Sequence, residues 1–196
     1  SAPRSADYLL PLIVELHGHL DIASLRNALI DVVARHTALR TTFADTPDGA
    51  MGTIVADPAS VVGDLPVRED VDAADCAGRL CDTGIDITVE APFRAALVRC
   101  EADHHALVLL VHHIAADGAS LPILVGDLAA AYHERVAGRT APWEPAYPDF
   151  RDYTLAMTSD EALESAAADT DYWTGLLADA PTDTAVPYSG PAPARE

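Results

Sequence analysis

Apolar residues recur along the first forty positions of this chain with two different periods. Residues 10–16 form a mostly apolar run that predicts a strand. From Asp21 onward the spacing lengthens to three or four, which predicts a helix whose apolar face carries Leu25, Leu29 and Val33. Asp21 suits the N-cap of that helix, because a short carboxylate accepts hydrogen bonds from the first helical N–H groups.

A hairpin and a weakly patterned region follow. Two stretches with β-branched residues, 39–43 and 53–55, flank a turn signal and predict an antiparallel pair of strands. Residues 57–70 are predicted to be loop with one extended stretch at 65–68, and residues 71–82 to form a modest helix.

The strongest strand signals lie in the middle of the chain. Residues 93–99 alternate enough for a half-buried strand. Residues 106–111 are apolar throughout, which predicts a strand in the middle of a sheet that is covered on both faces. Strands mixed with helical segments place the chain in the α/β class.

Helical patterns dominate the last third. Ser120 is expected to cap a helix over residues 121–137, with Gly138 as its stop. Two more helices are expected at 150–157 and at 161–177, the second with an interruption.

Composition narrows the possible partners. The 196 residues suffice for one core or for one large lobe of a two-lobed protein. A formal charge of −19 argues against nucleic acid or an anionic membrane as the partner. No apolar run approaches the roughly 20 residues of a membrane span, and the first residues lack the apolar core of a secretion signal, so we expect a cytoplasmic protein.

The cysteines and a first histidine pair give no metal signature. Cys76, Cys81 and Cys100 lack a CxxC spacing and are expected to be buried free thiols. His104 and His105 lack an HxH or HExxH spacing, so we expect a solvated strand entrance and no metal site.

A second histidine pair stands where the central strand ends. Residues 112–118 read HHIAADG and separate the apolar run from the helix that Ser120 opens. Histidine exchanges a proton near neutral pH, so this turn is a candidate catalytic site.

This turn matches the HHxxxDG signature, and the chain resembles the condensation domains of nonribosomal peptide synthetases. Residues 35–43, RHTALRTTF, resemble the family's RHxxLRTxF motif in order and in distance from the histidines. Residues 8–25 resemble its first strand and helix, and residues 150–155 and 171–178 resemble segments that follow its catalytic helix. The resemblance spans nearly the whole chain.

The resemblance implies a chloramphenicol-acetyltransferase-like lobe, a two-layer α/β sandwich in which helices cover a mixed sheet. Residues 1–180 would form the N-terminal lobe, without the family's opening motif, and residues 181–196 a linker towards a C-terminal lobe. The expected partners are donor and acceptor peptidyl carrier proteins, adjacent synthetase domains and the C-terminal lobe. Substrates would arrive on the carriers' 4′-phosphopantetheine arms, and no cofactor is expected to bind directly.

The implied reaction joins a carrier-bound acyl or peptidyl thioester to the amine of a carrier-bound aminoacyl acceptor. His113 would orient that amine or take its proton as a general base, and both roles stay open. Gly118 would allow close backbone approach and offer its N–H to the developing oxyanion. His112 would support the turn, and Arg40 would form an ion pair with Asp117 that fixes it.

Three other functions remain open. An epimerisation domain shares the histidine pair, although residues 119–121 lack the Ser-Trp expected there. A non-catalytic condensation-like module would recruit carrier or tailoring proteins, although the intact His113, Asp117 and Gly118 speak against decay. The isolated lobe is expected to be an inactive folding unit. Arg35 is predicted to lie at the surface, and Trp143 to be a packing anchor.

Overall fold

The computed structural model describes residues 8–47, 49–69, 71–141, 143 and 149–181. The chain divides into two compact units, Ser1–Phe150 and Arg151–Glu196. The predicted linker at 181–196 lies outside the described residues except for its first position.

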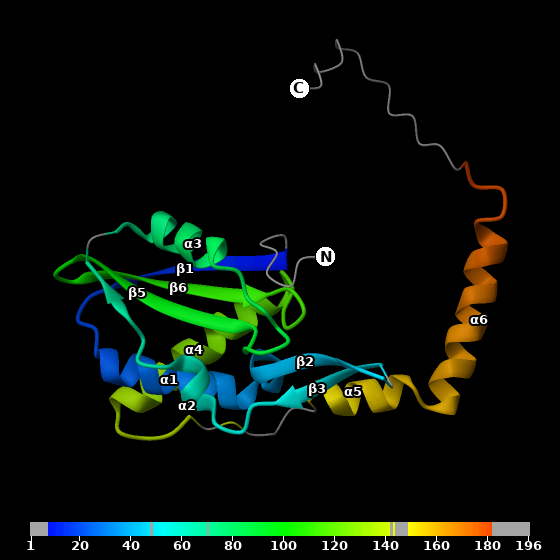
Figure 1. The fold of residues 1–196 in the computed structure, drawn as a ribbon, viewed down its shortest axis with the longest axis horizontal. Coiled ribbons are helices and arrows are strands. Elements are labelled where there is room, and N and C mark those ends of the chain that lie inside the picture. Colours follow the sequence, from blue (N-terminus) through cyan, green and yellow to red (C-terminus); the bar gives the residue numbers. More distant parts are fainter. Residues whose placement is uncertain (1–7, 48, 70, 142, 144–148, 182–196) are drawn as a thin grey trace, which may run out of the picture. The chain divides into compact units, whose positions relative to one another are not determined.

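A four-stranded mixed sheet forms the centre of the first unit (Figure 1). Its order is β1 (Leu9–His17), β6 (His104–His112), β5 (Phe93–Glu101) and β4 (Val67–Arg68). The first three strands pair antiparallel, and β4 pairs parallel with β5. Residues 106–111 of β6 are completely buried, so the prediction of an inner strand covered on both faces is confirmed.

Helices cover both faces of this sheet. Helices α1 (Ile22–Arg35) and α4 (Ser120–Val136) cover the face that carries Leu107 and Leu109, whereas α3 (Ala73–Asp82) packs on Ala106 and Val108 of the other (Figure 1). Asp21 caps α1 as predicted, since its carboxylate accepts a hydrogen bond from the Ser24 N–H at 3.0 Å. The predicted α/β class with a mixed, helix-covered sheet is confirmed, and α3 adds a helix on the second face beyond the two layers expected.

The connection between α1 and the sheet contains four short elements. A 3-10 helix, η2 (Thr37–Arg40), leads into the hairpin of β2 (Thr41–Thr46) and β3 (Gly49–Ile54), which confirms the predicted hairpin. Helix α2 (Pro58–Val62) lies in the stretch predicted as loop. Its start signals are Asp57, whose carboxylate accepts from the Ala59 N–H at 3.0 Å, and Pro58 in the first turn.

The start of α4 differs from the prediction. Ser120 is the first helical residue, and Ala119 occupies the N-cap without a side-chain hydrogen bond. The Asp117 carboxylate instead accepts from the Ser120 N–H at 2.9 Å. Gly138 follows the helix with φ at +71°, a conformation that glycine adopts without steric cost, so the predicted stop is confirmed.

The last two helices are α5 (Phe150–Met157), which begins at the end of the first unit, and α6 (Asp160–Leu176) in the second. Ser159 caps α6 through a hydrogen bond from the Ala162 N–H at 3.3 Å. Helix α6 is continuous, so the predicted interruption was wrong. Among the described residues, no helix has both the length and the apolar character of a membrane span.

Candidate active site

The histidine turn is fixed to the strands on either side of it. The His112 N–H donates to the Pro92 carbonyl at 3.0 Å, next to β5. The His113 N–H donates to the Tyr8 carbonyl at 2.7 Å, next to β1. Because these two hydrogen bonds attach the turn to the same sheet, the backbone that carries the two successive imidazoles is held in place.

His112 is the inner member of the pair. It is half-buried, its Nδ1 accepts a hydrogen bond from the Ile114 N–H at 3.1 Å, and its ring stacks against Tyr8 with 6.1 Å between centroids. An N–H donated to Nδ1 selects the neutral tautomer that is protonated at Nε2. Desolvation lowers the pKa of His112, and the neighbouring His113 lowers it further.

A pH dependence follows from that lowered pKa. The unfolded chain takes up a proton on His112 more readily than the folded chain does. The contribution of His112 to the free energy of unfolding is therefore fully present above its ordinary pKa of about 6.5. This contribution is lost as the pH falls through the lower pKa of the folded state.

His113 and Gly118 lie on the exposed side of the turn. A Cβ at Gly118 would meet no atom of the described residues within 4 Å, so packing against them does not demand glycine there. The backbone at this position is open to an approaching molecule.

Asp117 and Ser120 close a local ring of hydrogen bonds between the turn and α4. The Ser120 hydroxyl donates to the Asp117 carboxylate at 2.6 Å and accepts from the Asp117 N–H at 3.2 Å. The hydroxyl, followed by the Ser120 N–H, lowers the pKa of Asp117. Asp117 therefore stays ionised and holds the turn against the first residue of α4.

The expected ion pair between Arg40 and Asp117 was wrong. Arg40 donates to the carbonyls of Val33 at 3.2 Å, Ala34 at 3.4 Å and Val55 at 2.7 Å. The last carbonyls of a helix lack partners within it, and the guanidinium satisfies two of them at the end of α1. Arg40 thus joins α1 to the segment after β3.

A second charged group was missed. Asp127 of α4 lies 3.0 Å from Arg35 Nε and 2.7 Å from His36 Nε2, measured at the same carboxylate oxygen. The Arg35 guanidinium also lies 4.4 Å from the ring centre of Trp143, a cation–π contact. The Arg35 side chain is only 11% exposed, so its predicted surface position was wrong, and Trp143 packs against the core as predicted.

This group borders a pocket of about 210 Å³ beside the histidine turn. Residues from the end of α1, from the turn and from α4 line it, among them Arg35, His36, Ala115, Ala116 and Leu124. The signal was present in the sequence, because the Arg35-His36 pair opens the RHxxLRTxF motif. Sequence spacing alone did not indicate that Asp127 would face both side chains.

The first histidine pair is not a uniformly solvated strand entrance. His105 is only 5% exposed, and its Nδ1 has no hydrogen-bond partner among the residues that the structure describes. His104 is half-buried, and its Nε2 lies 2.6 Å from the Glu15 carboxylate. Of the cysteines, Cys76 is buried, Cys81 is half-buried and Cys100 is exposed, so burial was predicted correctly only for Cys76.

Comparison with known families confirms the resemblance seen in the motifs. The family model described as "Condensation domain" matches residues 1–195. A probable non-canonical nonribosomal peptide synthetase, CymA of Salinispora arenicola, is 39% identical over 97% of this chain and 2% of that protein. The dimodular nonribosomal peptide synthase of Bacillus subtilis is 34% identical over 96% of this chain and 8% of that protein. The chain thus spans less than a tenth of these relatives.

Solved structures of similar fold include two kinds of domain. The X-domain from teicoplanin biosynthesis, in its complex with OxyB, has a TM-score of 0.74 and 29% identity over 98% of this chain and 43% of that chain. The starter condensation domain of rhizomide synthetase RzmA has a TM-score of 0.75 and 21% identity over 92% of this chain and 45% of that chain. The second likeness concerns the fold alone, and it agrees with the expected fold class.

Proposed function

The chain belongs to the condensation-domain family, and we propose that it supplies the histidine-bearing lobe of an active site that forms amide bonds. The single observation that supports this best is the placement of His113. Its side chain is exposed at the end of a buried strand, and hydrogen bonds to Pro92 and Tyr8 hold the backbone of the turn.

The proposed reaction transfers an acyl group from sulfur to nitrogen. The neutral amine of the acceptor attacks the thioester carbonyl, a C–N bond forms, the C–S bond breaks, and the amine's proton ends on the departing thiol. His113 hydrogen-bonds the attacking amine or carries its proton, and such a group contributes about 10² to 10⁴ in rate. The Gly118 N–H, next to the start of α4, would face the developing oxyanion.

The supporting residues act through the turn. His112 remains neutral behind His113, because an N–H bond to its Nδ1 and desolvation both favour the uncharged ring. Asp117 ties the turn to α4 through Ser120. These three residues are positioning residues, and none of them needs to touch substrate.

The proposal includes partners outside this chain. Donor and acceptor carrier proteins would present the thioester and the amine on 4′-phosphopantetheine arms, and a second lobe would complete the substrate tunnel. Residues 1–180 would serve as the N-terminal lobe and residues 181–196 as the connection to that second lobe. Adjacent synthetase domains agree with relatives that are many times longer than this chain, and a cytoplasmic location is part of the proposal.

The test replaces His113 with alanine in the complete polypeptide that carries this sequence, loaded with acylated carriers. We expect the rate of dipeptidyl-carrier formation, followed by intact-protein mass spectrometry, to fall about 10²- to 10⁴-fold. His19→Ala, an exposed histidine on the β1–α1 connection, serves as the matched control and keeps the wild-type rate. Near wild-type turnover in His113→Ala contradicts the proposal.

A second candidate function is recruitment of a tailoring protein without catalysis. The likeness to the X-domain that is solved in complex with OxyB supports it, because that likeness covers 98% of this chain at 29% identity. One comparison, of the chain with and without the His113 side chain, distinguishes the two functions. A recruiting module binds its partner equally well with or without His113 and forms no product in either case.

A further inference from the structure

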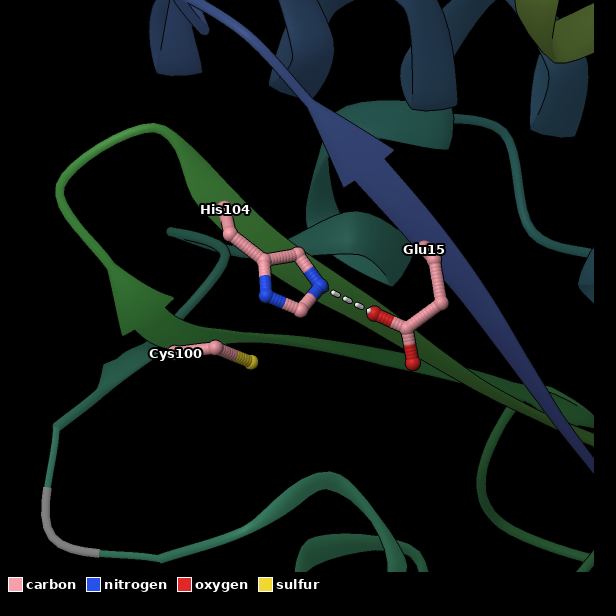
Figure 2. A group of neighbouring side chains, drawn as sticks. All are labelled: Glu15, Cys100 and His104. Atoms are coloured by element: carbon pink, nitrogen blue, oxygen red, sulfur yellow. Dashed lines mark hydrogen bonds and ion pairs between the residues drawn. The ribbon is translucent and has the colours of Figure 1, made fainter.

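A cluster of three different metal-binding side chains lies at the end of the sheet opposite the histidine turn. Glu15 comes from β1, Cys100 from the end of β5 and His104 from the start of β6. The strand pairing is irregular between Arg99 and Glu101, and a bulge of this kind re-aims the side chain that it contains. Figure 2 shows the three side chains converging from these strands.

The spacing of the donor atoms suits one small ion. One donor atom from each residue lies within 4.8 Å of the other two. Donors around a tetrahedral Zn²⁺ lie about 3.3–3.6 Å apart, given metal–ligand bonds of about 2.0–2.3 Å. His104 Nε2 and the Glu15 carboxylate start closer, at 2.6 Å, so a small side-chain rotation would admit the ion between them.

The donor set selects the class of metal. A thiolate, an imidazole and a carboxylate are ligands for borderline ions such as Zn²⁺, whereas Mg²⁺ and Ca²⁺ prefer oxygen alone. The His17 imidazole stacks on His104 with 4.4 Å between ring centres and offers a further nitrogen nearby. The formal charge of −19 also favours cations at the surface of this chain.

We propose that Glu15, Cys100 and His104 form a Zn²⁺-class site that ties β1, β5 and β6 together. Binding converts the Cys100 thiol to a thiolate and releases its proton to solvent. The site lies about 26 Å from the histidine turn along β6, at about 3.3 Å per residue, and its role is structural. It is independent of the proposed amide-forming function.

The experiment titrates the untagged, reduced full chain with Co²⁺ as a spectroscopic probe and repeats the titration with Zn²⁺ in competition. We expect one equivalent of Co²⁺ to produce a near-ultraviolet thiolate-to-cobalt absorption band that Zn²⁺ abolishes. Zn²⁺ also protects Cys100 from a thiol reagent and raises the melting temperature, because it binds only the folded chain.

Variants identify the ligands. Cys100→Ser removes the absorption band, and His104→Gln and Glu15→Gln each weaken Co²⁺ binding at least about tenfold. Cys81→Ser, which alters the half-buried thiol on α3, is the matched control and retains the band. Far-ultraviolet circular dichroism of each variant without metal checks its fold, and His104→Gln replaces Cys100→Ser if the latter does not fold.

Two results overturn the proposal. One is a Co²⁺ titration of the reduced wild-type chain that yields no thiolate band and no thermal shift with Zn²⁺. The other is a band that persists in Cys100→Ser or that Cys81→Ser removes. Either result leaves Glu15 and His104 as an ordinary hydrogen-bonded pair at the surface.

Discussion

At the scale of single residues, Arg40 and Asp117 have separate tasks. The resemblance implied one ion pair between them, whereas each finds closer partners in its own segment. Asp117 is a short side chain beside a helix start, and Ser120 three residues later meets its carboxylate. Arg40 follows a helix end, where the carbonyls of Val33 and Ala34 accept its N–H groups. Motif matching identified both residues but not their contacts.

A double-mutant cycle tests this separation. Arg40→Ala leaves several carbonyls without their charged donor and should lower the free energy of unfolding by about 2 kcal/mol. Asp117→Asn weakens the hydrogen bonds that the carboxylate accepts from Ser120, so it should lower the melting temperature independently of Arg40→Ala. Urea unfolding of the double variant should show additive effects, since the two side chains share no partner among the residues that the structure describes. A coupling free energy well above experimental error would instead support a direct ion pair between Arg40 and Asp117.

At the scale of elements, hydrophobic periodicity predicted the long helices and strands and their buried faces. It identified β1, α1, β5, β6 and α4, because each carries a continuous apolar face or run that one period describes. It missed α2, whose five residues are too few to establish a period. It also missed the charges that join helices, because Arg35 and Asp127 are 92 positions apart and only tertiary packing brings them together.

The contact between α1 and α4 supplies an element-scale prediction. Asp127 of α4 faces both Arg35 and His36, and its side chain is 20% exposed. Asp127→Asn removes a carboxylate charge that faces the largely buried Arg35 guanidinium, so we expect a loss of about 2 kcal/mol in the free energy of unfolding. Chemical denaturation measures this loss, and Asp45→Asn on the exposed side of β2 is the matched control, with a change below about 0.5 kcal/mol. Equal effects of the two substitutions would contradict a stabilising role for the Asp127 group.

At the scale of the whole molecule, the described core lies within the first unit. Its buried residues run from Leu9 to Ala131, and none comes from α5 or α6. Length allowed one sizeable core or one large lobe of a two-lobed protein, and one four-stranded sheet covered on both faces agrees with either. The division near Phe150 was not predicted, because the helical pattern of α5 and α6 gave no sign of how little of their surface is buried.

Truncation after α5 tests whether the first unit folds without α6 and the residues that follow it. A chain that ends at Thr158 keeps the sheet and every buried core residue. It also keeps the five residues of the proposed amide-forming site, which are His112, His113, Asp117, Gly118 and Ser120. Its melting temperature should lie within about 4 °C of the full chain, a shift that about 1 kcal/mol causes in a domain of this size.

A chain that ends at Ala119 is the control. It lacks α4 and with it the buried Leu124, Leu128 and Ala131, so it should lose cooperative unfolding. Thermal circular dichroism distinguishes these outcomes. If the chain ending at Thr158 also melts without a cooperative transition, residues beyond it are required for the core.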